Sequence, residues 1–194
     1  MKRKFFILIE FILYISFITL DLLNINSSYI KYLSIVLCFV YSLTNHNKPR
    51  IISSFFTMIA DFFLLMVDNY YELGLISFII VQMSYLYFLG NSDKAYFNMF
   101  LYLRGLFIMM GIIILYILKQ LSFLNILVII YFINLVFNCI QAFILKQKTL
   151  ALGLLLFMCC DICVGLHNIN NAYTIASFLM WVFYLPSQVL IVLA

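Results

Sequence analysis

Long apolar runs alternate with short polar breaks along the whole chain. Breaks such as NINSS, TNHNKPR and KQKT separate runs of about 16 to 23 residues, close to the roughly 20 that a helix needs to cross a hydrocarbon core. The runs are continuously apolar and lack the residue-by-residue alternation of a membrane β-barrel. We therefore predict eight membrane-spanning helices, over residues 5–23, 29–44, 51–67, 72–90, 98–118, 122–145, 149–167 and 172–194.

The connections between these runs are short, so consecutive helices are expected to be antiparallel neighbours in one bundle. The first run extends to about residue 23 with no small-residue cleavage site after it, and we interpret it as a spanning helix rather than a signal peptide. No stretch remains for a soluble domain. The prediction is an all-α integral membrane protein, with residues 1–194 forming a single transmembrane domain.

Composition supports this class. Hydrophobic residues make up 67% of the chain, against about half in a soluble domain. The five cysteines all lie in apolar runs and are expected to be reduced thiols. The abundance of Ile, Asn, Lys, Tyr and Phe suggests an AT-rich bacterial genome, so we expect a multi-pass protein of a bacterial inner membrane.

The basic residues predict the orientation of the bundle, because cations concentrate on the cytoplasmic side of membrane proteins. Lys31 and Lys119 lie on one side, whereas the other side, which carries both termini, holds Lys2, Arg3, Lys4, Lys48, Arg50, Lys94, Lys146 and Lys148. Both termini are therefore predicted to be cytoplasmic. These cations are scattered over short loops beside the membrane, so the net charge of +4 gives no reason to expect a nucleic-acid partner.

Two aspartates, Asp61 and Asp161, interrupt long apolar runs. A carboxylate inside a bilayer is costly, which makes each a candidate functional residue. Asp61 lies 13 residues beyond Lys48, and Asp161 lies 13 beyond Lys148. A helix rises 1.5 Å per residue, so both are expected about 20 Å along their helices. Two carboxyl groups at one depth predict a shared site.

Asp61 and Asp161 are 100 residues apart, and the same offset relates other identical residues. It also pairs Lys48 with Lys148, Met58 with Met158, Ser77 with Ser177 and Phe78 with Phe178. A shift of four helices preserves helix direction, so this pattern predicts two parallel repeats, residues 1–97 and 98–194, about an axis along the membrane normal. Such an axis would let Asp61 and Asp161 face each other.

The ordered pattern of residues in two segments resembles the YhhN-type lysoplasmalogenases. The first segment, about 48 to 90, contributes Lys48, Pro49, Ala60, Asp61, Gly74, Leu75, Phe78 and Tyr85. The second, about 149 to 192, contributes Gly153, Phe157, Asp161, Trp181, Tyr184, Gln188, Leu190 and Ile191. One position departs from the family pattern: Gln82 stands where the family commonly has a histidine, so a proton-transfer role for that residue does not carry over.

The resemblance implies hydrolysis of the vinyl ether bond of lysoplasmalogens, which yields a fatty aldehyde and a glycerophospho-ethanolamine or glycerophosphocholine. Catalysis is expected from Asp61 and Asp161 without metal or cofactor. One carboxyl would hold its proton and act as an acid while the other stays charged, as in glycosidases, and either assignment is open. The substrate, a lysophospholipid from the membrane, is expected to contact Gln82, Tyr85, Tyr184, Gln188, Lys48 and Arg104.

Other polar residues have simpler interpretations. Ser53, Thr57 and Asp61 recur every fourth residue and predict a polar stripe facing the bundle interior. Glu10 and Arg104 lie at similar shallow depths and are expected to form an ion pair. Four polar residues remain: the amides Asn134 and Asn138, and the histidines His46 and His167. The amides are expected to join helices, and the histidines lie on opposite faces and cannot share a metal ion.

Two other functions are compatible with this pattern. Paired intramembrane carboxylates and parallel repeats also occur in small proton-coupled transporters. A lipid-binding membrane protein with a degenerate site is the third reading, and Gln82 in place of the family histidine is the observation that favours it.

Overall fold

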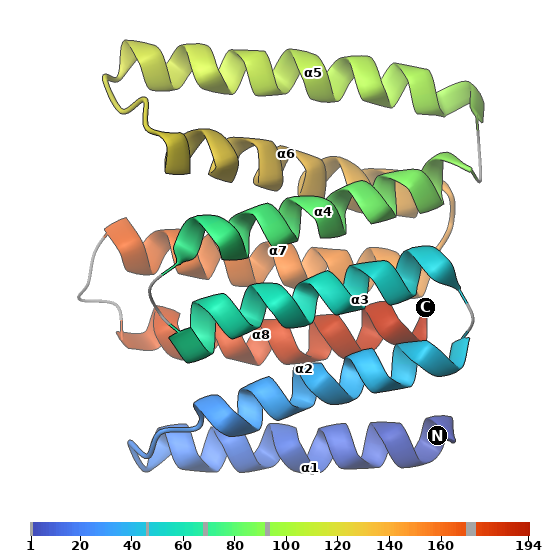
Figure 1. The fold of residues 1–194 in the computed structure, drawn as a ribbon, viewed down its shortest axis with the longest axis vertical. Helices are drawn as coiled ribbons and strands as arrows, with labels where there is room; N and C mark the ends of the chain where they lie inside the picture. The colour runs from blue at the N-terminus through green and yellow to red at the C-terminus, as the bar shows by residue number, and fades with distance from the viewer. Residues whose placement is uncertain (1, 46, 68–69, 92–93, 170–173) are drawn as a thin grey trace.

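A computed structural model describes residues 2–45, 47–67, 70–91, 94–169 and 174–194, and no described residue lies in a strand. The chain folds into a bundle of roughly parallel helical rods, with the N- and C-termini at the same end (Figure 1). The elements are α1 (Arg3–Leu22), α2 (Ser28–Ser42), the 3-10 turn η1 (Leu43–Asn45), α3 (Lys48–Asp61), the π-helix η2 (Phe62–Val67), α4 (Tyr71–Gly90), α5 (Lys94–Ile117), α6 (Phe123–Ile144), α7 (Lys148–Ile169) and α8 (Thr174–Leu193).

The structure confirms the all-helical fold and all eight predicted helices. Within the described residues, seven helices are long and apolar enough to cross a membrane. The exception is α2, which has 15 residues. It begins at Ser28 and carries Lys31 in its first turn, so its apolar part is short.

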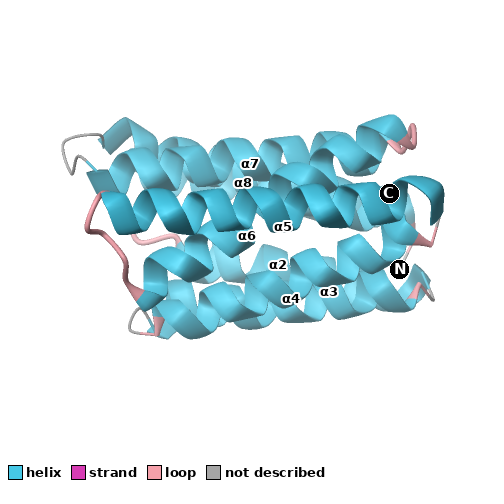
Figure 2. Ribbon diagram, turned by 90° about the horizontal axis from the view of Figure 1, so that it is seen from above, coloured by secondary structure: helices cyan, strands magenta, loops and turns pink. Residues whose placement is uncertain are grey.

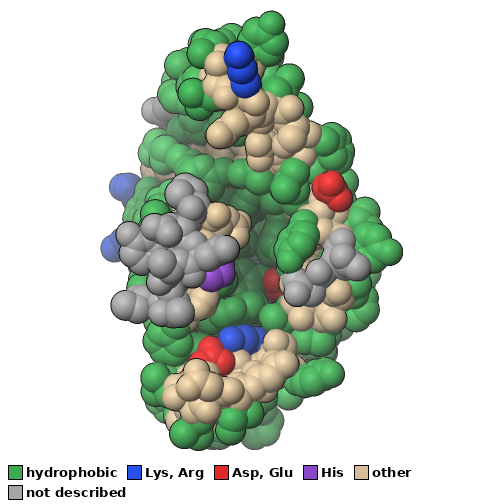
Figure 3. Space-filling view, turned by 90° about the vertical axis from the view of Figure 1, so that its left-hand side faces the viewer, with side chains coloured by type: hydrophobic (Ala, Val, Ile, Leu, Met, Phe, Trp, Pro, Cys, Tyr) green, Lys and Arg blue, Asp and Glu red, His purple; other side chains and the backbone are tan. Residues whose placement is uncertain are grey.

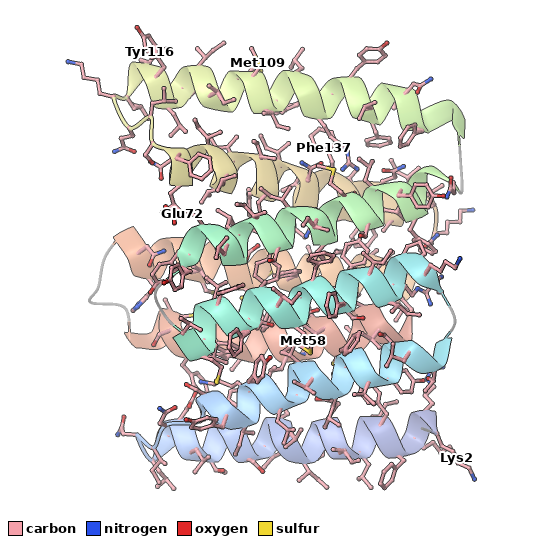
Figure 4. All side chains as sticks on the ribbon, viewed as in Figure 1. Lys2, Met58, Glu72, Met109, Tyr116 and Phe137 are labelled. Atoms are coloured by element: carbon pink, nitrogen blue, oxygen red, sulfur yellow. The ribbon has the colours of Figure 1, made fainter. Side chains whose placement is uncertain are left out.

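The two outermost helices, α1 and α5, lie at opposite edges of the bundle (Figure 1). Most of their large side chains are exposed, as expected for surfaces that face lipid tails. On α5, Met109 and Tyr116 point away from the bundle, whereas Phe137 of α6 points toward α5 (Figure 4). Viewed along another axis, α3 and α4 form one layer and α7 and α8 form the other (Figure 2). The buried core lies between these layers.

Helix neighbours in the first half have counterparts in the second half. The pairs α1–α2, α2–α3 and α3–α4 pack together, as do α5–α6, α6–α7 and α7–α8. Across the two halves, α4 packs on α6 and, correspondingly, α8 packs on α2. This arrangement is the one that a four-helix duplication would produce. The repeats themselves stay a prediction.

A proline inside α8 has a matching feature on α1. Pro186 has no N–H, so the carbonyl four residues earlier, that of Val182, loses its helical partner. The hydroxyl of Tyr14 on α1 donates to that carbonyl at 3.3 Å. The bond supplies the missing donor and joins the peripheral helix α1 to α8.

Candidate functional site

Asp61 lies where α3 changes into the π-helix η2. Its side chain is buried, with 4% exposed, although hydrophobic residues surround it in sequence. The hydroxyl of Tyr184 on α8 donates to its Oδ2 atom at 2.5 Å. Single π-helical turns occur often at functional sites, because the wider turn displaces side chains from regular helical positions. This local change at Asp61 was not predicted.

Asp161 lies inside α7 and is half-buried. The hydroxyl of Tyr131 on α6 donates to its Oδ2 atom at 2.6 Å. Each aspartate is thus held by one tyrosine from another helix, and the second oxygen of each carboxyl group stays outside these bonds. A hydroxyl that donates to one oxygen fixes the orientation of a carboxyl group.

Aromatic rings connect the two aspartate–tyrosine pairs. The ring of Phe157 on α7 lies 5.3 Å from that of Tyr184 and 6.3 Å from that of Tyr131. Phe78 on α4 closes the cluster, 5.5 Å from Phe157 and 5.7 Å from Tyr131. All four rings are buried. We call Phe78, Tyr131, Phe157 and Tyr184 the aromatic cluster.

Both carboxyl groups act electrostatically on the same neighbours. The Tyr131 hydroxyl lies close enough to both Asp161 and Asp61 for an electrostatic interaction. The Cys160 thiol does so as well. These shared neighbours support the shared-site hypothesis, which stays a prediction.

The polar stripe on α3 is confirmed. Ser53, Thr57 and Asp61 are all buried, with exposures of 4% or less. The Ser53 hydroxyl donates to the backbone carbonyl of Arg50 at 2.9 Å. Among the described residues the Thr57 hydroxyl has no hydrogen-bond partner. Because an unpaired buried hydroxyl is costly, Thr57 is a candidate contact for a bound molecule near Asp61.

The expected ion pair between Glu10 and Arg104 is wrong. The guanidinium of Arg104 donates instead to the side-chain oxygens of three amides on α6, Asn134 at 3.0 Å, Asn138 at 2.9 Å and Gln141 at 3.1 Å. Glu10 accepts from Ser34 on α2, and from the Cys38 thiol at 3.7 Å. The two residues are on α1 and α5, at opposite edges of the bundle (Figure 1).

The two polar clusters occupy matching positions. Ser34 and Cys38 on α2 stand 100 residues before Asn134 and Asn138 on α6. In each half, a charged side chain of the outermost helix reaches these two positions of the next helix. The correspondence supports the duplication from contacts, in addition to the sequence offset.

Gln82 and Tyr85, two of the expected substrate contacts, are deeply buried on α4. The side-chain oxygen of Gln82 and its backbone carbonyl both accept from Asn138, each at 2.9 Å. The expectation that Asn138 joins helices is thus confirmed. Tyr85 contacts the Ser53 side chain. Gln82 is therefore part of the polar cluster around Arg104.

Two predicted contacts remain, Gln188 and Lys48. Gln188 is buried on α8, and Lys48 is exposed at the start of α3, near the termini. A cavity of about 200 Å³ at this end includes Arg50, Lys148 and the C-terminal Ala194. His46 lies outside the described residues, and His167 is half-buried near the end of α7.

The opposite end of the molecule is hollowed. Viewed from the side away from the termini, hydrophobic side chains line a depression near the centre of the surface (Figure 3). α2 and α8 begin at this end, and η2, which follows Asp61, runs toward it. The depression therefore opens on the side of the membrane that the positive-inside pattern assigns to the exterior.

Two buried residues with polar partners were missed in the sequence. Tyr131 was one, although it continues the polar positions 134, 138 and 141 along one face of α6. Lys31 was the other, because it was counted only as a topology signal. It is 7% exposed, and its ammonium forms an ion pair with Asp21 at 2.8 Å. No second ion pair is found in the part of the chain that the structure describes.

Comparison with known proteins yielded one match. The model of the YhhN family matches residues 26–194, which include all helices from α2 onward and both aspartates with their tyrosines. No similar curated protein and no similar solved structure was found. The match confirms the resemblance that the residues around Asp61 and Asp161 suggested, and it extends over both halves of the bundle. The chain belongs to the YhhN family, the family of lysoplasmalogenases.

Proposed function

We propose that this protein hydrolyses the vinyl ether bond of lysoplasmalogens, releasing a fatty aldehyde and a glycerophospho-ethanolamine or glycerophosphocholine. The observation that carries the proposal is the arrangement of two intramembrane carboxyl groups. Each is held by one tyrosine, and both lie beside one aromatic cluster. Family membership supports the reaction class. A substrate with one long chain suits the aromatic and aliphatic side chains that surround the two carboxyl groups.

The different burial of the two aspartates suggests their roles. Asp61 is almost fully buried, and a carboxyl group in low-dielectric surroundings is more stable in its neutral form. The side chain of Asp161 is less buried than that of Asp61, so burial penalises its charged form less. We assign Asp61 as the general acid and Asp161 as the general base.

The reaction then proceeds in balanced steps. Asp61 donates its proton to the β-carbon of the vinyl ether, which forms an oxocarbenium ion that the Asp161 carboxylate stabilises. A water oxygen bonds to the α-carbon while Asp161 accepts a proton from that water, giving a neutral hemiacetal. Asp161 next protonates the glycerol oxygen as its bond to the α-carbon breaks. Asp61 takes the hemiacetal hydroxyl proton, so both aspartates return to their starting states.

The two tyrosines position the carboxyl groups in this mechanism. We expect Tyr131→Phe and Tyr184→Phe each to lower kcat/KM about tenfold, because each removes the tyrosine hydrogen bond that orients one catalytic carboxyl group. Tyr14→Phe is the matched control, since its hydroxyl donates to the backbone carbonyl of Val182 rather than to a carboxyl group. Aldehyde release by the purified variants measures the effect. Equal activity in all three would contradict a positioning role.

The direct test of function is an assay of purified protein in detergent. A lysoplasmalogen should release a fatty aldehyde, and a lysolipid with an ester bond in the same position should yield none by this chemistry, because an acyl ester has no vinyl ether double bond to protonate. A parallel experiment in sealed vesicles addresses the transporter alternative. Flux of a lipid or proton without bond cleavage would overturn the hydrolase proposal, as would binding of the lysolipid with no cleavage.

A further inference from the structure

Lys31 occupies an unusual place for a lysine. It lies one turn into α2, at the end of the bundle away from the termini, and is almost fully buried. Its ammonium donates to Asp21 Oδ2 at 2.8 Å, and the Ser27 hydroxyl donates to the other oxygen of Asp21. An ammonium has three donors, and the described residues supply one acceptor. A buried lysine on this side is also contrary to the positive-inside pattern.

Aromatic rings connect Lys31 to the proposed catalytic centre. Its Nζ atom lies 5.0 Å from the ring centre of Trp181 on α8 and 5.5 Å from that of Phe17 on α1. The Trp181 ring stands 5.4 Å from the Tyr184 ring, at an angle of 85°. Tyr184 in turn holds Asp61. A continuous set of contacts thus runs from the ammonium to the carboxyl group.

The duplication pattern gives an independent reason for Lys31 to face the interior. Lys31 on α2 corresponds to Tyr131 on α6 by the offset of 100 residues, one turn before the matching pair Ser34 and Asn134. Tyr131 reaches the aspartate of its own half. Lys31 therefore occupies, in the first half, the position from which the second half contacts the site.

We propose that Lys31 and Asp21 bind the zwitterionic head group of a lysophospholipid. This inference rests on the proposed function and names how its site selects substrate. The phosphate accepts from Lys31, and the positively charged amine lies against Asp21. The two opposite charges, 2.8 Å apart, complement a phosphate and an amine carried by one head group. The glycerol unit spans the rings of Trp181 and Tyr184, which brings the vinyl ether to Asp61.

Trp181 provides the measurement, because it is the single tryptophan of the chain. An alkyl-ether lysophosphoethanolamine has no vinyl double bond, so it binds without being hydrolysed. Its titration should change the Trp181 fluorescence to saturation, and Lys31→Gln should weaken its affinity about tenfold, the effect of one lost charged hydrogen bond. Affinity for the alkylglycerol, which lacks the phosphate, should stay unchanged. Lys31→Arg, which keeps the charge, should retain binding of the phospholipid.

Two further variants complete the design. Lys119→Gln removes an exposed lysine at the same end and should leave both affinities unchanged. Asp21→Asn should weaken the phosphoethanolamine ligand but not an alkylglycerol phosphate, which has no amine. If Lys31→Gln weakens binding of the lysophosphoethanolamine and of the alkylglycerol equally, or of neither, Lys31 only joins α1 to α2 and the proposal is wrong. Binding is measured without catalysis, so absence of hydrolysis in the wild type would overturn the proposed function but not this one.

Discussion

Asp61→Asn and Asp161→Asn are each expected to reduce aldehyde release from lysoplasmalogen by roughly 10² to 10⁴, the usual contribution of a positioned acid or base. Asparagine cannot deliver or accept the transferred proton. It keeps an oxygen that accepts from Tyr184 or Tyr131, so the packing around each position should persist. Turnover of the purified variants in detergent, compared with their thermal unfolding midpoints, separates lost chemistry from lost folding.

Glu10→Gln is the matched control for these variants. Glu10 is another carboxyl group in a membrane helix and is buried like Asp61, and Ser34 donates to it as the tyrosines donate to the aspartates. Its contacts lie on α1 and α2, away from the aromatic cluster. We expect it to retain activity. Full activity in either aspartate variant would remove that residue from the mechanism, and inactivity of all three would indicate a general effect on the fold.

The sequence was sufficient to predict an all-helical membrane fold, because a lipid environment strongly limits the secondary structure of long apolar runs. Unbroken apolar runs can satisfy their backbone groups in lipid only as helices, so helix number and approximate ends follow from the polar breaks. The depth of each residue in the membrane was calculated from the constant rise per residue, and it stays a prediction. Asp61 and Asp161 stood out because isolated charges contrast with their surroundings.

The packing between helices that are not consecutive in the chain was not readable, nor was the rotation of helices that lack a polar stripe. Depth alone suggested that Glu10 and Arg104 pair, yet they lie on helices at opposite edges of the bundle. Tyr131 gave no contrast, because the chain contains 14 tyrosines and 21 phenylalanines. The π-helix after Asp61 depends on packing against other helices. These are tertiary properties, which spacing along one helix does not determine.

Close packing of α7 against α8 holds Tyr184 near Asp61, and this contact can be tested at Gly153. Gly153 on α7 faces α8, and a Cβ added there would lie 2.7 Å from Cγ1 of Ile191. It would also lie 3.1 Å from two backbone atoms, the Ile191 nitrogen and the Ser187 oxygen. Side chains can rotate away from such a contact, but the backbone of α8 can move only as a whole. Small residues commonly permit close helix approach in membranes.

We therefore expect Gly153→Ala to lower the free energy of unfolding by about 1 to 3 kcal/mol, as overpacked sites do, and Gly153→Leu to lower it further. Gly165 is the matched control on the same helix, because a Cβ there meets nothing within 4 Å. Gly165→Ala should gain about 0.5 to 1 kcal/mol from helix propensity alone.

Unfolding in detergent, followed by circular dichroism, measures this difference. Equal stabilisation by both alanines would show that α7 and α8 are further apart than described. Aldehyde release should fall with the stability of the Gly153 variants, because displacing α8 moves Tyr184 away from Asp61, whereas the Gly165 variant should keep full activity.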